Sequence, residues 1–365
     1  MKKFLSIIAL MIMAFVLVAC GGDESDWKIV MITDVGTITD KSFNQGTWEG
    51  VEKFGKDHDI TAQYYRPNEG TQKDYEEAID FSVANGANVI VTPGFLFETA
   101  IYTSQTKYPD VHFILIDGQP HDGNYNVKTE KNTVNILFQE EQPGFLAGYA
   151  AVAEGYQTLG FMGGMAVPAV VKFGIGYVAG AFYAANELEK EITFDANRYE
   201  YLGNFDNDPL HTTKAAGWYD NGVDVIFAAA GGAGNAVMAA AEQKEKKVIG
   251  VDIDQASESP TVVSSAMKEL GNAVYQELDA LINKDSFKGG ETLYKGAKED
   301  AIGLPKGDSF RFKTFTETQY DEVYNLVKNE TIVVPQTMSE LTTFLKDKAG
   351  NPDVAALVAK TEPAA

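Results

Sequence analysis

The stretch KIVMITDVGTITDKSFNQGTWEGVEKF, residues 28–54, decides the fold class. It begins with a run of apolar residues, which predicts a buried β-strand. A polar turn follows, and apolar side chains then recur at helical spacing at Trp48, Val51 and Phe54, which predicts a helix with one buried face. A strand followed at once by such a helix is the repeating unit of a parallel sheet covered by helices.

The same alternation of short apolar runs and helix-like stretches continues along the chain. The predicted strands form two successive sets: 28–33, 61–65, 89–92, 112–116 and 134–138, then 158–162, 198–202, 223–228, 247–251 and 261–264. The runs are nearly continuous in apolar residues, which is typical of strands covered by helices on both faces. The fold class is therefore α/β, with two doubly wound lobes and a ligand cleft between them.

One connecting helix can be predicted in detail. Thr71 is a suitable N-cap, Asp74 lies in the first turn, and Asn85-Gly86 ends the helix. Its buried face is expected to carry Tyr75, Ala78, Ile79 and Ser82.

The first residues of the chain are predicted to precede the folded part. Lys2 and Lys3 come before an apolar stretch that ends at Ala19, which is typical of a secretory signal peptide and too short to span a membrane. Cys20, the single cysteine of the chain, comes next. This junction resembles the lipobox of bacterial lipoproteins. The resemblance implies that Cys20 carries lipid and anchors the protein to the cell membrane on its extracytoplasmic face.

The predicted organisation is a signal peptide at 1–19, the lipidated cysteine and linker at 20–27, lobe 1 at 28–145 plus about 256–300, lobe 2 at 146–255 plus about 301–345, and a flexible tail at 346–365. The formal net charge of −22 argues against a nucleic-acid partner, because affinity for phosphates depends on basic side chains. We expect a monomer.

In parallel sheets ligands bind at the carboxyl ends of the strands, so the residues that follow each apolar run are the candidate site. They are Asp34-Val35-Gly36, Pro93-Gly94-Phe95, Asp117-Gly118, Gly163-Gly164, Gly203-Asn204-Phe205-Asp206, Gly231-Gly232-Ala233-Gly234 and Asp252-Ile253-Asp254-Gln255. Turn formation explains aspartate and glycine but does not explain the rings of Phe43 and Phe205. Carboxylates, open backbone amides and flat rings suit a neutral ligand with hydroxyl groups and a planar ring, such as a nucleoside.

Other chemistries fit the sequence less well. Phosphate is not expected as the recognised group, because the carboxylates would repel it and no P-loop motif is present. No metal or cofactor is required, and the histidines share no ligand spacing. We therefore expect no catalysis. The alternatives are a nucleoside hydrolase-like enzyme, although Asp34 and Asp40 are separated by Val-Gly-Thr-Ile-Thr, and a nucleoside sensor lipoprotein without a transport partner.

Several motifs resemble the basic membrane protein (Med/PnrA-like) family, the substrate-binding lipoproteins of nucleoside ABC transporters. They are Thr33-Asp34-Val35-Gly36, Asp40-Lys41-Ser42-Phe43-Asn44-Gln45, Phe113-Ile114-Leu115-Ile116-Asp117, Gly144-Phe145-Leu146-Ala147-Gly148 and Ile249-Gly250-Val251-Asp252-Ile253-Asp254-Gln255. The resemblance implies a type I periplasmic-binding-protein fold that closes on its ligand. It also implies delivery of a nucleoside, with purine nucleosides preferred, to the permease and ATPase subunits of an ABC transporter.

The resemblance also implies roles for individual residues. Phe43 and Phe205 would hold the base between them. The remaining contacts would be Asp117 and Asn44 to the polar edge of the base, and Asp34, Gly232, Asp252 and Lys268 to the ribose. Independently of the resemblance, Asp117 as an acceptor favours a base with adjacent N–H donors, such as inosine or guanosine. Ser42 is expected to cap the helix that follows, and Asp40 lies at the helix end that favours negative charge.

Overall fold

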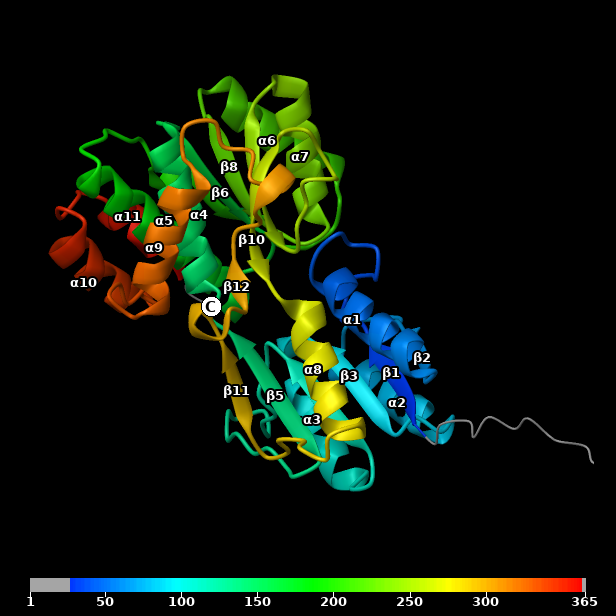
Figure 1. Cartoon of the computed structure of the whole chain (residues 1–365). Helices are drawn as coiled ribbons and strands as arrows, with labels where there is room; N and C mark the ends of the chain where they lie inside the picture. The colour runs from blue at the N-terminus through cyan, green and yellow to red at the C-terminus, as the bar shows by residue number, and fades with distance from the viewer. Residues whose placement is uncertain (1–26, 363–365) are drawn as a thin grey trace, which may run out of the picture.

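The computed structural model describes residues 27–362, which form two lobes, each built on one six-stranded sheet (Figure 1). The predicted signal peptide, Cys20 and residues 363–365 lie outside the described residues. In the first sheet the strand order is β11-β5-β4-β3-β1-β2, and all pairs are parallel. Its strands are β1 (Lys28–Ile32), β2 (Thr61–Tyr65), β3 (Val89–Pro93), β4 (His112–Ile116), β5 (Thr133–Phe138) and β11 (Thr292–Lys295).

The second sheet has the order β12-β10-β9-β8-β6-β7, and only the β10–β12 pair is antiparallel. Its strands are β6 (Leu159–Gly163), β7 (Tyr199–Tyr201), β8 (Val225–Ala229), β9 (Lys247–Asp252), β10 (Val262–Lys268) and β12 (Ile302–Gly303). Every predicted strand is present. The two strands that were not predicted, β11 and β12, are short and lie at sheet edges, so neither has the continuous apolar run of a central strand.

Helices cover both sheets (Figure 1). They are α1 (Phe43–His58), α2 (Gln72–Ala84), α3 (Glu98–Lys107), α4 (Glu141–Glu154), α5 (Pro168–Glu187), α6 (Pro209–Asp220), α7 (Ala233–Lys244), α8 (Leu270–Ile282), α9 (Glu317–Lys328), α10 (Met338–Lys348) and α11 (Ala355–Thr361). The prediction for α2 is confirmed: Thr71 and Asp74 form a reciprocal capping box, Asn85 is the C-cap, and Tyr75 and Ile79 are buried.

Within residues 27–362 the chain crosses between the sheets three times, after β5, after β10 and after β11. The boundaries predicted at 145 and about 256 are therefore wrong. The whole of α4 packs against α5 in the second lobe, although its first residues were assigned to lobe 1. The strand β10 pairs with β9 of the second sheet, although all of it was assigned to lobe 1. The buried strand β10 needs a parallel neighbour, so the return to the first lobe follows Lys268 and begins with α8.

The prediction of a flexible tail from residue 346 is also wrong for the described residues. Leu357 and Val358 in α11 are buried, and the Tyr201 hydroxyl donates a hydrogen bond to the carbonyl of Thr361. The Ala/Pro-rich composition concealed this short helix, because two apolar side chains are enough to dock it on β7 and α5.

Helices α4 and α5 pack unusually closely because glycines face each other. A Cβ atom on Gly148 would lie 2.2 Å from the carbonyl oxygen of Tyr177, and one on Gly180 would lie 2.0 Å from the carbonyl oxygen of Phe145. By length and composition α5 could cross a membrane, but 67% of its most apolar 18-residue stretch is buried inside the protein. It is therefore the core helix of the second lobe, and the Gly144–Gly148 motif serves this contact.

Gly148→Ala is expected to lower the free energy of unfolding by about 1–3 kcal/mol, because the new methyl group would overlap backbone and force the helices apart. Urea unfolding measures the change. The matched control is Gly217→Ala in α6, where a Cβ atom has open space and helix propensity should favour alanine slightly. Equal effects of the two substitutions would contradict the close-packing explanation.

Candidate ligand-binding site

A cavity of about 510 Å³ lies between the lobes at the carboxyl ends of the strands of both sheets. This volume is within the range of small-molecule sites. The structure brings all the residues that were predicted to bind the ligand to its wall. They are Asp34, Phe43, Asn44 and Asp117 from the first lobe, and Phe205, Gly232, Asp252 and Lys268 from the second.

The turn between β1 and α1 is organised by Asp40. Its carboxylate accepts hydrogen bonds from the backbone N–H groups of Ser42 (2.8 Å), Asn44 (2.9 Å) and Gln45 (3.1 Å). The prediction that Asp40 supports the helix start is confirmed, whereas the expected cap from the Ser42 side chain is wrong. The hydroxyl of Ser42 instead donates to Oδ2 of Asp252 in the other lobe, because Asp40 already satisfies the N-terminal N–H groups.

Asn44 links the two aspartates of this turn. Its amide nitrogen donates to Oδ1 of Asp34 at 2.9 Å and to Oδ2 of Asp40 at 3.0 Å, and its oxygen accepts from the backbone N–H of Asp34 at 3.3 Å. The side chain is buried. Asn44 therefore positions the carboxylate of Asp34 at the cavity wall, and its direct contact with a base stays a prediction.

Asp34 presents one oxygen to the protein and one to the cavity. Oδ1 accepts from the backbone N–H of Gly36 at 2.7 Å as well as from Asn44. Burial raises the pKa of Asp34 to about 6, although these hydrogen bonds act in the opposite direction. The other oxygen, Oδ2, lies beside Gly94, which also lines the cavity. A carboxylate in this position can accept hydrogen bonds from hydroxyl groups of a ligand.

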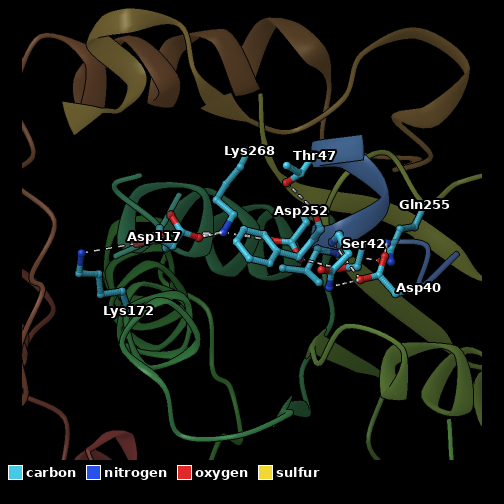
Figure 2. A network of polar contacts seen from close by, with 12 residues as sticks. Asp40, Ser42, Thr47, Asp117, Lys172, Asp252, Gln255 and Lys268 are labelled. Carbon is cyan, nitrogen blue, oxygen red and sulfur yellow. Dashed lines mark hydrogen bonds and ion pairs between the residues drawn. The ribbon is translucent and has the colours of Figure 1, made fainter. Parts of the chain in front are cut away.

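Lys268 is the centre of a buried network of charges (Figure 2). Its ammonium lies 2.6 Å from Oδ2 of Asp117, 3.3 Å from Oδ1 of Asp252 and 3.8 Å from Oε1 of Glu140. Lys172 lies 3.5 Å from the other oxygen of Glu140. Burial alone would lower the pKa of Lys268, but the three carboxylates outweigh it and raise the pKa above its usual range. Burial and the charge of Asp117 raise the pKa of Glu140.

Asp117 is the acceptor that this network leaves available. Its Oδ1 atom is buried and has no hydrogen-bond partner among residues 27–362, while Oδ2 holds Lys268. The backbone of Asp117 is left-handed, with φ of 53°, a conformation that aspartate tolerates better than most residues. An unpaired buried carboxylate oxygen is costly, so this atom is the strongest indication of a donor on the ligand.

Two aromatic rings line the cavity from opposite lobes. Phe43 lies beside Gly94, and the Lys268 ammonium is 4.5 Å from the centre of its ring. The ring of Phe205 packs against Gly164 and Gly231, which follow β6 and β8. A Cβ atom on Gly164 would lie 2.3 Å from this ring and one on Gly231 would lie 3.3 Å from it, so larger residues would not fit without movement. The glycines after these strands therefore make room for an aromatic wall, which explains why glycine and phenylalanine occur together in the sequence.

Sequence reasoning missed several residues of the site. Arg66, which follows β2, lines the cavity, and Glu140, which follows β5, pairs with Lys268; the rule that ligands bind after strand ends points to both positions. Phe173 and Asn235 also line the cavity, but from within α5 and α7, where no strand-end signal exists. Their positions depend on how the helices pack on the second sheet.

Within residues 27–362, no three His, Cys, Asp or Glu side chains gather in a way that could hold a metal ion. His121 pairs with Glu98 at 3.1 Å and His211 with Asn204 at 3.0 Å. Neither histidine belongs to the cavity wall, so in the described part of the chain the cavity offers carboxylates, backbone amides, rings and cations.

Two parallel-sheet lobes with a cavity between the carboxyl ends of their strands define a binding protein of the type I periplasmic-binding-protein fold. An ABC transporter solute-binding protein from Aeropyrum pernix has the same fold, with a TM-score of 0.74 and 22% sequence identity, covering 92% of this chain and 99% of that chain.

Residues 27–338 match the family described as ABC transporter substrate-binding protein PnrA-like, and the chain belongs to this family. Basic membrane protein B of Borreliella burgdorferi is 30% identical over 352 residues, 93% of this chain and 98% of that protein. The ABC transporter nucleoside-binding protein BmpA of Lactococcus lactis is 29% identical over 308 residues, 78% of this chain and 83% of that protein. The predicted family and fold class are confirmed.

Asp34→Asn is expected to stabilise the protein at pH 8 and to leave stability unchanged near pH 4. The folded-state pKa of about 6 lies above the ordinary 3.8, so ionisation costs stability progressively as pH rises from about 4 to above 6. Asparagine keeps the acceptor for Gly36 without the charge. Urea unfolding at the two pH values should show a gain of about 1–2 kcal/mol at pH 8 only. A loss of stability at pH 8 would contradict the conclusion that burial raises the pKa of Asp34 and makes its ionisation costly.

Proposed function

We propose that this protein captures nucleosides, with purine nucleosides preferred, in the interlobe cavity and delivers them to an ABC permease. The observation that carries the proposal is the unpaired buried Oδ1 of Asp117, a residue of the same cavity wall as Phe43 and Phe205. A purine nucleoside with an N1–H group supplies both a donor for this oxygen and a flat surface for the rings. The nucleoside-binding relative from Lactococcus lactis supports this choice of ligand.

The contacts are sufficient for useful affinity. Stacking of a base on an aromatic ring contributes about 1–3 kcal/mol, and a hydrogen bond to a charged group about 1.5–3 kcal/mol. Asp34 and Asp252 line the cavity from opposite lobes together with Gly232. In this proposal the two carboxylates accept hydrogen bonds from ribose hydroxyls, and the glycine lets the sugar approach the backbone. Two rings and a few such hydrogen bonds reach the ~8 kcal/mol of micromolar binding after the cost of association.

The transport role includes an anchor on the extracytoplasmic face of the cell membrane. In this proposal lipid on Cys20 holds a monomeric binding domain beside the membrane, where it meets the permease and its ATPase. The basis is the signal-like sequence before Cys20 and membership of an ABC transporter family. Metabolic labelling with radioactive palmitate tests the anchor: label should be incorporated by the natural chain and lost in Cys20→Ala.

Isothermal titration with inosine, guanosine, adenosine, cytidine and uridine tests the ligand. The expected result is micromolar or tighter binding of purine nucleosides, and Phe43→Ala should weaken it at least tenfold because one wall of the base site is lost. The matched control is Phe81→Ala, which removes an exposed phenylalanine of α2 outside the cavity and should leave affinity unchanged. The absence of heat with every nucleoside would overturn the proposed function.

A further inference from the structure

A second group of contacts joins the lobes through side chains that are buried and lie outside the cavity wall. The hydroxyl of Ser42 in the first lobe donates to Oδ2 of Asp252 in the second. The Gln255 side chain, also in the second lobe, donates from Nε2 to the carbonyl oxygen of Lys41 at 2.6 Å. We call Ser42 and Gln255 the latch residues. Both are fully or almost fully buried, and neither belongs to the cavity wall (Figure 2).

The side chain of Gln255 is held in place by hydrogen bonds within the second lobe. Oε1 of Gln255 accepts from the backbone N–H of Val251 at 2.8 Å, and its own backbone N–H donates to Ser265 at 3.1 Å, so the side chain is directed at the opposite lobe. Across the gap, Lys41 has a left-handed backbone with φ of 62°, which is strained for lysine. The strained backbone of Lys41 and the fixed side-chain amide of Gln255 indicate that the hydrogen bond between them is a specific contact.

These contacts involve protein groups alone, so they stabilise the closed arrangement whether or not a ligand lies between the lobes. They also act on the binding site directly, because Ser42 fixes the carboxylate of Asp252, which in turn pairs with Lys268. A ligand that contacts both lobes needs their cavity walls at the distance that the latch sets. Affinity therefore depends on residues that never touch the ligand.

We propose that Ser42 and Gln255 are positioning residues, which hold the lobes closed from behind the cavity and thereby slow release of the ligand. The effect on release rests on the proposed nucleoside function, whereas the effect on closure does not. Because the latch favours the closed form in every state of the protein, its removal should open the ligand-free protein and accelerate dissociation, with little effect on the rate of encounter.

Gln255→Glu separates the interlobe bond from the intralobe one. Ionised glutamate keeps the oxygen that accepts from Val251 but places a second acceptor oxygen against the carbonyl of Lys41, so the bond between the lobes is lost while the bond to Val251 is retained. Ser42→Ala removes the other latch bond by a different route. The matched control is Glu258→Gln, which removes the partly exposed interlobe ion pair with Lys41 (3.6 Å), where solvent weakens the interaction.

Small-angle X-ray scattering of the ligand-free protein is the first measurement. Each latch variant should have a larger radius of gyration than the natural chain, whereas Glu258→Gln should match it, with the urea midpoint used to show that all three are folded. Stopped-flow dissociation of inosine is the second, and each latch variant should release it at least fivefold faster with an association rate within twofold of the natural chain.

An unchanged radius of gyration in both latch variants would overturn the proposal, and this result can be read even if no nucleoside binds. Open variants with an unchanged dissociation rate would overturn the link between the latch and ligand release. If Ser42→Ala fails to fold, Gln255→Glu alone decides, because it retains the intralobe contacts of its loop. Absence of inosine binding in the natural chain would count against the proposed function and would leave the scattering result to decide closure.

Discussion

The rest of the site depends on one interaction, the burial of the Lys268 ammonium among the carboxylates of Asp117, Asp252 and Glu140. A buried lysine without partners would be too costly to remain charged, and three buried carboxylates without a cation would repel each other. The pairing satisfies one oxygen of Asp117 and leaves the other buried without a hydrogen-bond partner among residues 27–362. The proposed recognition of a ligand donor rests on this unpaired oxygen of Asp117.

The same charges lie where the chain passes between the lobes. Lys268 ends β10, immediately before the crossing to α8, and Glu140 follows β5, immediately before α4. Asp117 follows β4 and Asp252 ends β9, which are central strands of opposite sheets, so a single ammonium contacts carboxylates from both lobes. The tight glycine contact between α4 and α5 keeps the second lobe rigid beside these charged groups. The proposed binding of a ligand and the proposed closure of the lobes therefore depend on the same few residues.

Much of this arrangement could be predicted from the sequence because it depends on local patterns. Apolar runs identified the central strands, and the strand-end rule identified Asp34, Asp117 and Asp252, since parallel strands bring their carboxyl ends together. Sequence could not show that Asn44 and Lys268 are already engaged by carboxylates, because those contacts join residues far apart in the chain or across a turn. The strand β12 and the docked helix α11 were missed for a related reason: their stability comes from tertiary contacts instead of their own pattern.

The central claim is that the unpaired oxygen of Asp117 recognises an N–H donor on the base. Titration of Asp117→Asn with inosine and adenosine tests it most directly. The asparagine oxygen should turn to Lys268, which directs its N–H₂ group into the cavity and replaces an acceptor by a donor. The ratio of the inosine Kd to the adenosine Kd should then rise at least tenfold, because N1 of inosine carries a hydrogen and N1 of adenosine accepts one. An unchanged ratio would contradict the account.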